Sequence, residues 1–183
     1  TIAVIGSGHL GSSIIEKLFK TGHKSLIATR RNQAELVNLK GRFPGLKVMT
    51  SNQEAVGLAD VVILTMKEYS FGDLAKELVD SLAEKLVISL GPTLSFEKLS
   101  EIFGPQKGMK MARVMTPVYP HEDLVCYSLD AVCSEREEEI VRSIFSNHGK
   151  NIERVEEAML PIVTTYVVFR GVLNSFLEPL YQK

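Results

Sequence analysis

The feature that most constrains this chain is a glycine-rich segment between an apolar run and a helical pattern. Residues 2–5 are β-branched or small apolar residues, typical of a buried parallel strand. Glycines follow with the spacing Gly-x-Gly-x-x-Gly at Gly6, Gly8 and Gly11. Gly6 permits a tight turn, Gly8 lets the backbone approach a pyrophosphate, and Gly11 lets the next helix lie against the strand. The segment therefore predicts a dinucleotide site at the helix N-terminus, the alternative being a turn that binds nothing.

The tip of the second expected strand, residues 25–29, indicates which dinucleotide binds. This tip consists of Thr29, Arg30, Arg31 and Asn32, and it holds two guanidinium groups and no carboxylate. A site for NAD places Asp or Glu here, to accept a hydrogen bond from the ribose 2′-hydroxyl. Guanidinium groups instead form forked, charge-assisted hydrogen bonds with a phosphate. The tip favours NADP (NADPH) over NAD, unless both arginines are solvated surface residues.

The composition excludes several other classes of partner. A formal net charge of −1 gives no electrostatic reason to expect nucleic acid or an anionic membrane. Cys126 and Cys133 lie in an apolar, alternating stretch without metal-ligand spacing, which predicts buried, reduced thiols, no metal site and a cytoplasmic protein. Because the first residue directly precedes a strand, we expect no signal peptide.

Apolar runs and helical patterns alternate along most of the chain. We expect helices over residues 12–20, 33–40 (ended by Gly41), 52–58, 70–82, 95–102 and 135–147. We expect strands over residues 2–5, 25–29, 46–50, 61–65, 86–90, 110–115, 124–133 and 149–155. Strands that alternate with helices predict an α/β fold, with a doubly wound, mostly parallel sheet and right-handed crossovers. We expect this domain to span residues 1–155.

The C-terminal segment, residues 156–183, breaks this alternation. From residue 159 to residue 180 apolar residues recur near helical spacing, and Val167 and Val168 add apolar surface on the other side. A helix that is apolar almost all round is buried or spans a membrane, and Arg170 and Glu178 argue against a span of this length. We therefore predict that residues 159–183 form a helix buried against a second copy of the chain, in a homodimer.

The order of these motifs resembles the NADP-binding domain of the pyrroline-5-carboxylate reductases, in the superfamily that includes the F420-dependent NADP reductases. The matching segments are residues 5–11, 28–31, 59–67, 87–91, 112–115, 149 and 155–157. The resemblance implies a Rossmann domain followed by the start of a helical dimerisation domain. It also implies hydride transfer from NADPH to a cyclic imine, with proline as the product.

Two segments depart from the family pattern. Thr116 and Pro117 stand where the family has Pro-Asn-Thr-Pro, so the asparagine that the family places near the nicotinamide is missing. Residues 164–171 lack the family's Ser-Gly-Ser-Gly-Pro run, and most of the helical domain would lie beyond Lys183. Two alternatives therefore stand beside the imine reductase: a dinucleotide-binding module without catalysis, and an F420-dependent NADP reductase.

The candidate cofactor-binding residues lie at the carboxyl ends of the first, second and fourth expected strands, where open α/β sheets bind ligands. They are Gly6, Ser7, Gly8, His9, Leu10, Gly11, Thr29, Arg30, Arg31, Thr65, Met66 and Lys67. His9 is a candidate proton donor or a positioning residue. Lys67 faces the cofactor ribose or is solvated.

Candidate catalytic residues are fewer. Alignment with the resembling family from Glu156 and Glu157 onward places Ser175 near the family's proton-donating hydroxyl. Tyr119 and His121 follow the sixth expected strand, where they act as acids or lie in an exposed loop. Arg170 would pair with a substrate carboxylate or with an acidic residue of a partner chain.

Overall fold

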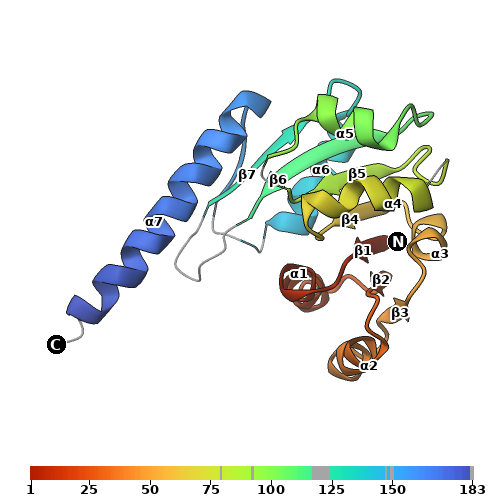
Figure 1. Ribbon diagram of the computed structural model, residues 1–183, viewed down its shortest axis with the longest axis horizontal. Helices are drawn as coiled ribbons and strands as arrows, with labels where there is room; N and C mark the ends of the chain where they lie inside the picture. The colour runs from red at the N-terminus through yellow and green to blue at the C-terminus, as the bar shows by residue number, and fades with distance from the viewer. Residues whose placement is uncertain (79, 92, 117–123, 147, 149–150, 182–183) are drawn as a thin grey trace.

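One sheet of eight strands, in the order β3-β2-β1-β4-β5-β6-β7-β8, organises this computed structural model (Figure 1). The structure describes residues 1–183 except residues 79, 92, 117–123, 147, 149–150 and 182–183, and it does not describe the side chains of residues 171 and 174–181. The strands are β1 (Ile2–Ile5), β2 (Leu26–Thr29), β3 (Lys47–Met49), β4 (Val61–Leu64), β5 (Leu86–Ser89), β6 (Lys110–Met115), β7 (Leu124–Leu129) and β8 (Asn151–Arg154).

Helices follow most of the strands. They are α1 (His9–Lys20), α2 (Gln33–Arg42), α3 (Asn52–Gly57), α4 (Phe71–Glu77), α5 (Phe96–Phe103), α6 (Glu135–Phe145) and α7 (Leu160–Tyr181), with short 3-10 helices η1 (Glu68–Ser70) and η2 (Glu157–Met159). Side chains of Asn32, Ser51 and Ser95 accept hydrogen bonds from backbone N–H groups at the starts of α2, α3 and α5. These caps satisfy donors that a helix end would otherwise leave unpaired.

The strand directions confirm the doubly wound, mostly parallel α/β fold. From β3 to β6 all neighbouring strands are parallel, and the order reverses at β1, which lies between β2 and β4. Strand β7 is antiparallel to β6, because only eight residues separate the two strands and a parallel crossover needs a dozen or more. The carboxyl ends of β1, β2 and β4 therefore meet at one edge, around the point of reversal.

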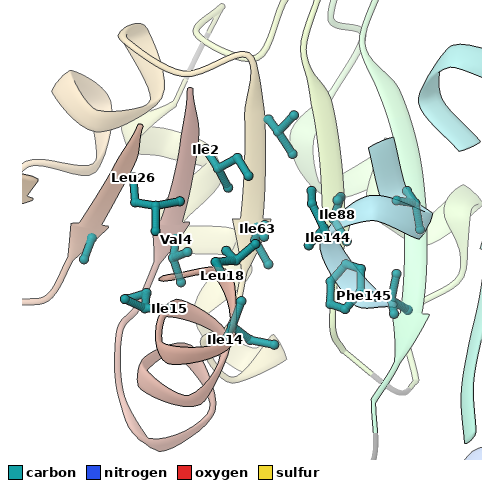
Figure 2. Packing of buried hydrophobic residues seen from close by; sticks show 14 of the residues in the cluster. Ile2, Val4, Ile14, Ile15, Leu18, Leu26, Ile63, Ile88, Ile144 and Phe145 are labelled. Carbon is teal, nitrogen blue, oxygen red and sulfur yellow. The ribbon is translucent and has the colours of Figure 1, made fainter. Parts of the chain in front are cut away.

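Two apolar cores cover the two faces of the sheet. Alternate residues of β1 point to opposite faces, so Val4 belongs to one core and Ile5 to the other. Figure 2 shows the first core, in which Ile14, Ile15 and Leu18 of α1 lie beside strand residues such as Val4. Residues of α3, α4 and α5 fill the second core, including Val56, Phe71 and Leu99. The central strands β1, β2, β4 and β5 are thus buried on both sides, as their near-continuous apolar sequences require.

Several element ends differ from the sequence-based expectation. Helix α1 begins at His9 rather than at residue 12, directly behind the glycine turn. Gly41 does not end α2: the helix runs to Arg42, and Phe43 ends it by turning into the core beside Phe19. Helix α4 ends at Glu77, five residues early, and Asp80 beyond it has a positive φ of 58°.

The second strand of the antiparallel pair is also shorter than expected. Strand β7 ends at Leu129 instead of residue 133, because Asp130 accepts hydrogen bonds from the N–H groups of Met111 and Val132 and turns the chain. Cys126 is buried, whereas Cys133 is only partly buried, and both are free thiols. Burial raises the pKa of the Cys133 thiol to about 12, so this thiol stays protonated at neutral pH.

Helix α7 leaves the domain along one side, and Figure 1 shows its C-terminal half running away from the sheet. Its start packs on β7 in a small cluster of Met115, Cys126, Leu160 and Val167. Large apolar side chains of α7 remain exposed: Ile162, Tyr166, Val168, Phe169, Val172 and Leu173. Among the described residues, no helix is long and apolar enough to cross a membrane.

Candidate functional site

The glycine loop after β1 contains two glycines that the fold itself requires. Gly6 has a φ of +85°, and a Cβ on it would lie 2.9 Å from the Cβ of Met66. A Cβ on Gly11 would lie 2.7 Å from Thr65 Oγ1, because α1 begins directly against the strand ends. Gly6 and Gly11 are thus needed for the turn and for the close approach of α1, whether or not a ligand binds.

Gly8 differs from these two glycines. A Cβ on Gly8 would have no neighbour closer than the Gly6 carbonyl oxygen at 3.8 Å, so the fold leaves open space there. Gly8 is also the N-cap of α1, which has no side-chain cap and no acidic residue in its first turn. The start of this twelve-residue helix therefore offers backbone N–H groups and a positive dipole end to an anion.

Three hollows lie along the carboxyl ends of the central strands. The arginine hollow, about 410 Å³, is lined by residues that include Gly8, Arg30, Arg31, Asn52 and Tyr69. The glycine-loop hollow, about 550 Å³, is lined by residues that include Gly8, His9, Leu10, Thr65 and Glu68. The apolar hollow, about 190 Å³, is lined by residues that include Leu10, Arg113, Met115, Leu160 and Val167.

Shared residues join the three hollows into one cleft. Gly6, Gly8, Met66 and Lys67 line both the arginine hollow and the glycine-loop hollow. Leu10, Leu90 and Gly91 line both the glycine-loop hollow and the apolar hollow. The cleft thus runs from two cations, past a helix N-terminus, to an apolar end. A molecule with an anionic end, a diphosphate middle and a flat, weakly polar end matches this order.

The two arginines at the tip of β2 are in different states. Arg30 Nη1 donates to the Ser7 carbonyl oxygen at 3.1 Å and lies 3.4 Å from Glu35 Oε2. Arg31 is exposed and has neither a hydrogen bond nor an ion pair within the part of the chain that the structure describes. Arg30 is therefore fixed against the glycine loop, whereas Arg31 keeps all its donors for a ligand.

The polar groups at the base of the arginine hollow are paired with one another. The Thr29 hydroxyl accepts from the Gly6 N–H at 3.3 Å and donates to Asn52 Oδ1 at 2.7 Å. The Asn52 amide donates in turn to Glu77 Oε2 at 2.7 Å. Thr29, which the sequence placed at the cofactor, is fully buried and positions the loop.

The residues after β4 form the opposite wall. The Thr65 hydroxyl is within 2.9 Å of the carbonyl oxygens of Ile5 and Gly6, so it ties this wall to the glycine loop. Met66 is partly buried, and Lys67 is exposed, with its Nζ 5.9 Å from the centre of the Tyr69 ring. The exposed His9 and Leu10, at the start of α1, face them across the glycine-loop hollow.

Ser7 lines none of the three hollows. Its side chain is fully buried, and its hydroxyl donates to the Val4 carbonyl oxygen at 3.3 Å. Its own N–H donates to the Thr29 carbonyl oxygen at 2.8 Å, which joins the glycine loop to β2. The structure thus gives the side chain of Ser7 a place inside the fold.

Sequence reasoning missed two charged residues that line the cleft, Arg113 and Glu68, and the carboxylate that pairs with Arg113. Arg113 of β6 is buried beside the apolar hollow, and its Nη1 donates to Glu157 Oε1 at 2.8 Å. The same carboxylate oxygen accepts from the Phe96 N–H at 2.6 Å, so Glu157 joins β6, α5 and the chain that leads into α7. Glu68 of η1 lines the glycine-loop hollow. A charged residue inside an apolar strand was the available signal for Arg113.

Most of the catalytic candidates fall on residues or side chains that the structure does not describe. Ser175 belongs to α7, but its side chain is outside the described residues, as are Tyr119 and His121. Arg170 is exposed on α7. Arg170 lines none of the three hollows.

Comparisons with known proteins found a matching family and several similar proteins. Residues 1–92 match the family described as NADP oxidoreductase, coenzyme F420-dependent. A pyrroline-5-carboxylate reductase from Corynebacterium melassecola is 27% identical over 172 residues, which is 90% of this chain and 62% of that protein. The chain thus spans less than two thirds of the length of this relative.

Two solved structures share the fold. A pyrroline carboxylate reductase from Plasmodium falciparum with NADP bound superposes with a TM-score of 0.82 at 22% identity, over 98% of this chain and 67% of that one. An imine reductase from Myxococcus stipitatus in complex with NADP+ gives a TM-score of 0.76 at 19% identity, over 98% of this chain and 64% of that one.

Proposed function

The chain belongs to the family of NADP oxidoreductases described as coenzyme F420-dependent, and from this membership we propose that it is an NADPH-dependent oxidoreductase that reduces a C=N bond. The observation that carries the proposal is the continuous cleft, which joins Arg31, the N-terminus of α1 and an apolar end in the order that NADPH requires. NADPH would supply the hydride, and the protein would supply binding, orientation and electrostatics.

Each part of the cleft suits one part of the cofactor. Arg31, with Arg30 fixed beside it, suits the 2′-phosphate. Both cations lie at the tip of β2, where a site for NAD would carry an Asp or Glu instead. The N–H groups at the start of α1 suit the pyrophosphate, and the open space at Gly8 lets it approach. The apolar hollow suits the nicotinamide ring and excludes water from its neighbourhood.

The class of acceptor rests on similarity. The curated relative is named as a pyrroline-5-carboxylate reductase, and one structural neighbour as an imine reductase. A cyclic imine such as pyrroline-5-carboxylate, reduced to proline, is therefore the proposed substrate class. The apolar hollow holds only Arg113, Thr116 and Thr164 as polar residues among its described lining, and Arg113 already pairs with Glu157. The chain's own part of the site thus favours a compact, mostly apolar ring.

We also propose that the chain is a homodimer formed through residues 159–183. Exposed apolar side chains cover α7, including Phe169, which is 66% exposed, and a contiguous patch of this kind is unusual on a monomer. In this proposal residues 1–155 are the cofactor domain, and the segment 156–183 serves the interface. Ser175 would then act as proton donor at the partner's cleft. Two free cysteines fit a reducing compartment such as the cytoplasm.

The test is to incubate the purified protein with NADPH and pyrroline-5-carboxylate and to follow NADPH oxidation. Oxidation that depends on the imine supports the proposal. Oxidation of reduced F420 on addition of NADP+, without imine reduction, would identify an F420-dependent reductase instead. Tight NADPH binding without turnover of either substrate would identify a dinucleotide-binding module, and the proposed catalysis would be wrong.

A further inference from the structure

A single carboxylate connects the two sides of the cleft near its apolar end. Glu68 follows β4, and its Oε1 accepts hydrogen bonds from the backbone N–H groups of Thr93 at 2.9 Å and Leu94 at 3.1 Å. The Thr93 hydroxyl donates to the other oxygen of the same carboxylate. Three donors from the loop after β5 therefore hold this carboxylate in one position.

The carboxylate lies where two hollows meet. Glu68 lines the glycine-loop hollow, and Gly91 lines both the glycine-loop hollow and the apolar hollow. A Cβ on Gly91 would collide with the carboxylate of Glu68, so the Glu68 side chain packs directly against Gly91. The negative charge is therefore placed at the junction that leads to the apolar end, away from the arginines at the other end of the cleft.

No cation neutralises this charge within the part of the chain that the structure describes. All three hydrogen-bond partners of Glu68 are neutral, and no ion pair of Glu68 occurs among the described residues. The neighbouring Lys67 turns its ammonium group toward the Tyr69 ring. Glu68 is partly buried, so its field is screened less than that of a fully exposed carboxylate.

We propose that the Glu68 carboxylate makes the cleft bind the oxidised cofactor, NADP+, in preference to NADPH. The inference rests on the proposed function, because it requires the nicotinamide to occupy the apolar end. The nicotinamide ring is positively charged in NADP+ and neutral in NADPH, whereas the rest of the cofactor is identical. A fixed negative charge near the ring therefore changes the ratio of the two affinities and leaves the contribution of the other groups unchanged.

This preference bears on the direction of the reaction. NADPH would supply a hydride to the imine carbon, and an acid or solvent would supply a proton to the imine nitrogen, so the nicotinamide ring would end positively charged. A carboxylate already fixed at the junction stabilises that charge without any rearrangement. Glu68 thus favours hydride donation by the bound cofactor, and it acts through its charge rather than through contact with the substrate.

The test measures the dissociation constants of NADP+ and NADPH by calorimetry for the wild type, Glu68→Gln and Asp73→Asn. Glutamine keeps an oxygen that accepts the two N–H groups but removes the charge, and the preference for NADP+ should fall about fivefold. Asp73→Asn is the matched control, because exposed Asp73 lines the arginine hollow and its charge should affect both affinities alike.

A second variant separates charge from loop geometry. Thr93→Val removes the hydroxyl donor and leaves the carboxylate charged, so the ratio of affinities should stay at the wild-type value. If Thr93→Val changes the ratio as much as Glu68→Gln does, the loop rather than the charge is responsible, and the inference is overturned. An unchanged ratio in Glu68→Gln overturns it as well, provided that both cofactors bind.

A measurement on the wild type alone keeps the inference testable if Glu68→Gln does not fold. The wild type should bind NADP+ more tightly than NADPH, and because Glu68 is partly buried, added salt should leave most of this preference in place. A wild type that binds NADPH as tightly as NADP+, or more tightly, contradicts the inference. If the wild type binds neither NADP+ nor NADPH, the proposed function itself fails.

Discussion

Replacing Gly8 by alanine should separate ligand binding from folding more cleanly than any other change in the glycine loop. A Cβ on Gly8 meets no atom closer than 3.8 Å, so the protein without ligand has room for it. The cost to folding should stay below about 1 kcal/mol, the scale of a poorer helix N-cap. The same Cβ, however, would project where a pyrophosphate must approach the backbone.

The expected loss of affinity follows from the contacts that the methyl group would prevent. Hydrogen bonds between backbone N–H groups and a charged phosphate contribute about 1.5 to 3 kcal/mol each. If Gly8→Ala weakens one or two of them, NADPH binding should fall by about 3 kcal/mol, or roughly 100-fold. Gly8→Val, with a larger side chain, should abolish binding while the fold persists.

Gly11→Ala provides the contrasting variant. Its Cβ would lie 2.7 Å from Thr65 Oγ1 and 3.2 Å from the Gly6 carbonyl oxygen, so it should lower stability by about 1 to 3 kcal/mol, the scale of overpacking. Urea unfolding gives the stabilities, and calorimetric titration with NADPH gives the affinities. A Gly8→Ala protein that folds and binds NADPH as tightly as the wild type would show that the loop is only a turn.

Three further predictions concern other parts of the chain. Arg31→Ala should weaken NADPH binding by about 1.5 to 3 kcal/mol and leave NADH binding unchanged; an equal loss of affinity for both cofactors would contradict this prediction. Arg30→Ala should in addition lower the stability of the fold, because Arg30 is bonded to the glycine loop. Phe169→Asp should convert a sedimenting dimer into monomers, while Val37→Asp on exposed α2 surface should not. Burial lowers the pKa of His148 in the folded protein from its ordinary 6.5 to about 3. Below pH 6.5 this imidazole is therefore protonated in the unfolded chain but not in the folded one, so the free energy of unfolding falls as the pH drops. Between pH 7 and pH 5 the wild type should lose about 2 kcal/mol more than His148→Phe, as measured by urea unfolding.

Local sequence patterns were sufficient to predict the architecture. The glycine spacing and the apolar runs placed β1, β2 and β4 within a residue of their observed bounds, because a buried parallel strand needs a short, continuous apolar segment. Element ends were less predictable. Gly41 lies inside α2, because the packing of Phe43 on the core decides where that helix ends.

The candidate cleft was only partly predictable, because long-range contacts shape it. The sequence brought Arg31, Gly8 and Lys67 together, since all three follow the carboxyl ends of neighbouring strands. It could not show that Ser7 turns its side chain into the fold. Nor could it show that Glu68 reaches a loop 25 residues away, or that Glu157 reaches Arg113 across 44 residues. Such contacts depend on how the strands are ordered, which no local pattern contains.

The most direct test of the account is a calorimetric titration of the wild-type protein with NADPH and, separately, with NADH. Because Arg30 and Arg31 replace the carboxylate of an NAD site, NADPH should bind more tightly by about 2 to 4 kcal/mol, or some 30- to 1,000-fold. High salt should reduce this difference, since it arises from the 2′-phosphate. Equal affinities for the two cofactors, or no binding of either, would contradict the assignment of the cleft.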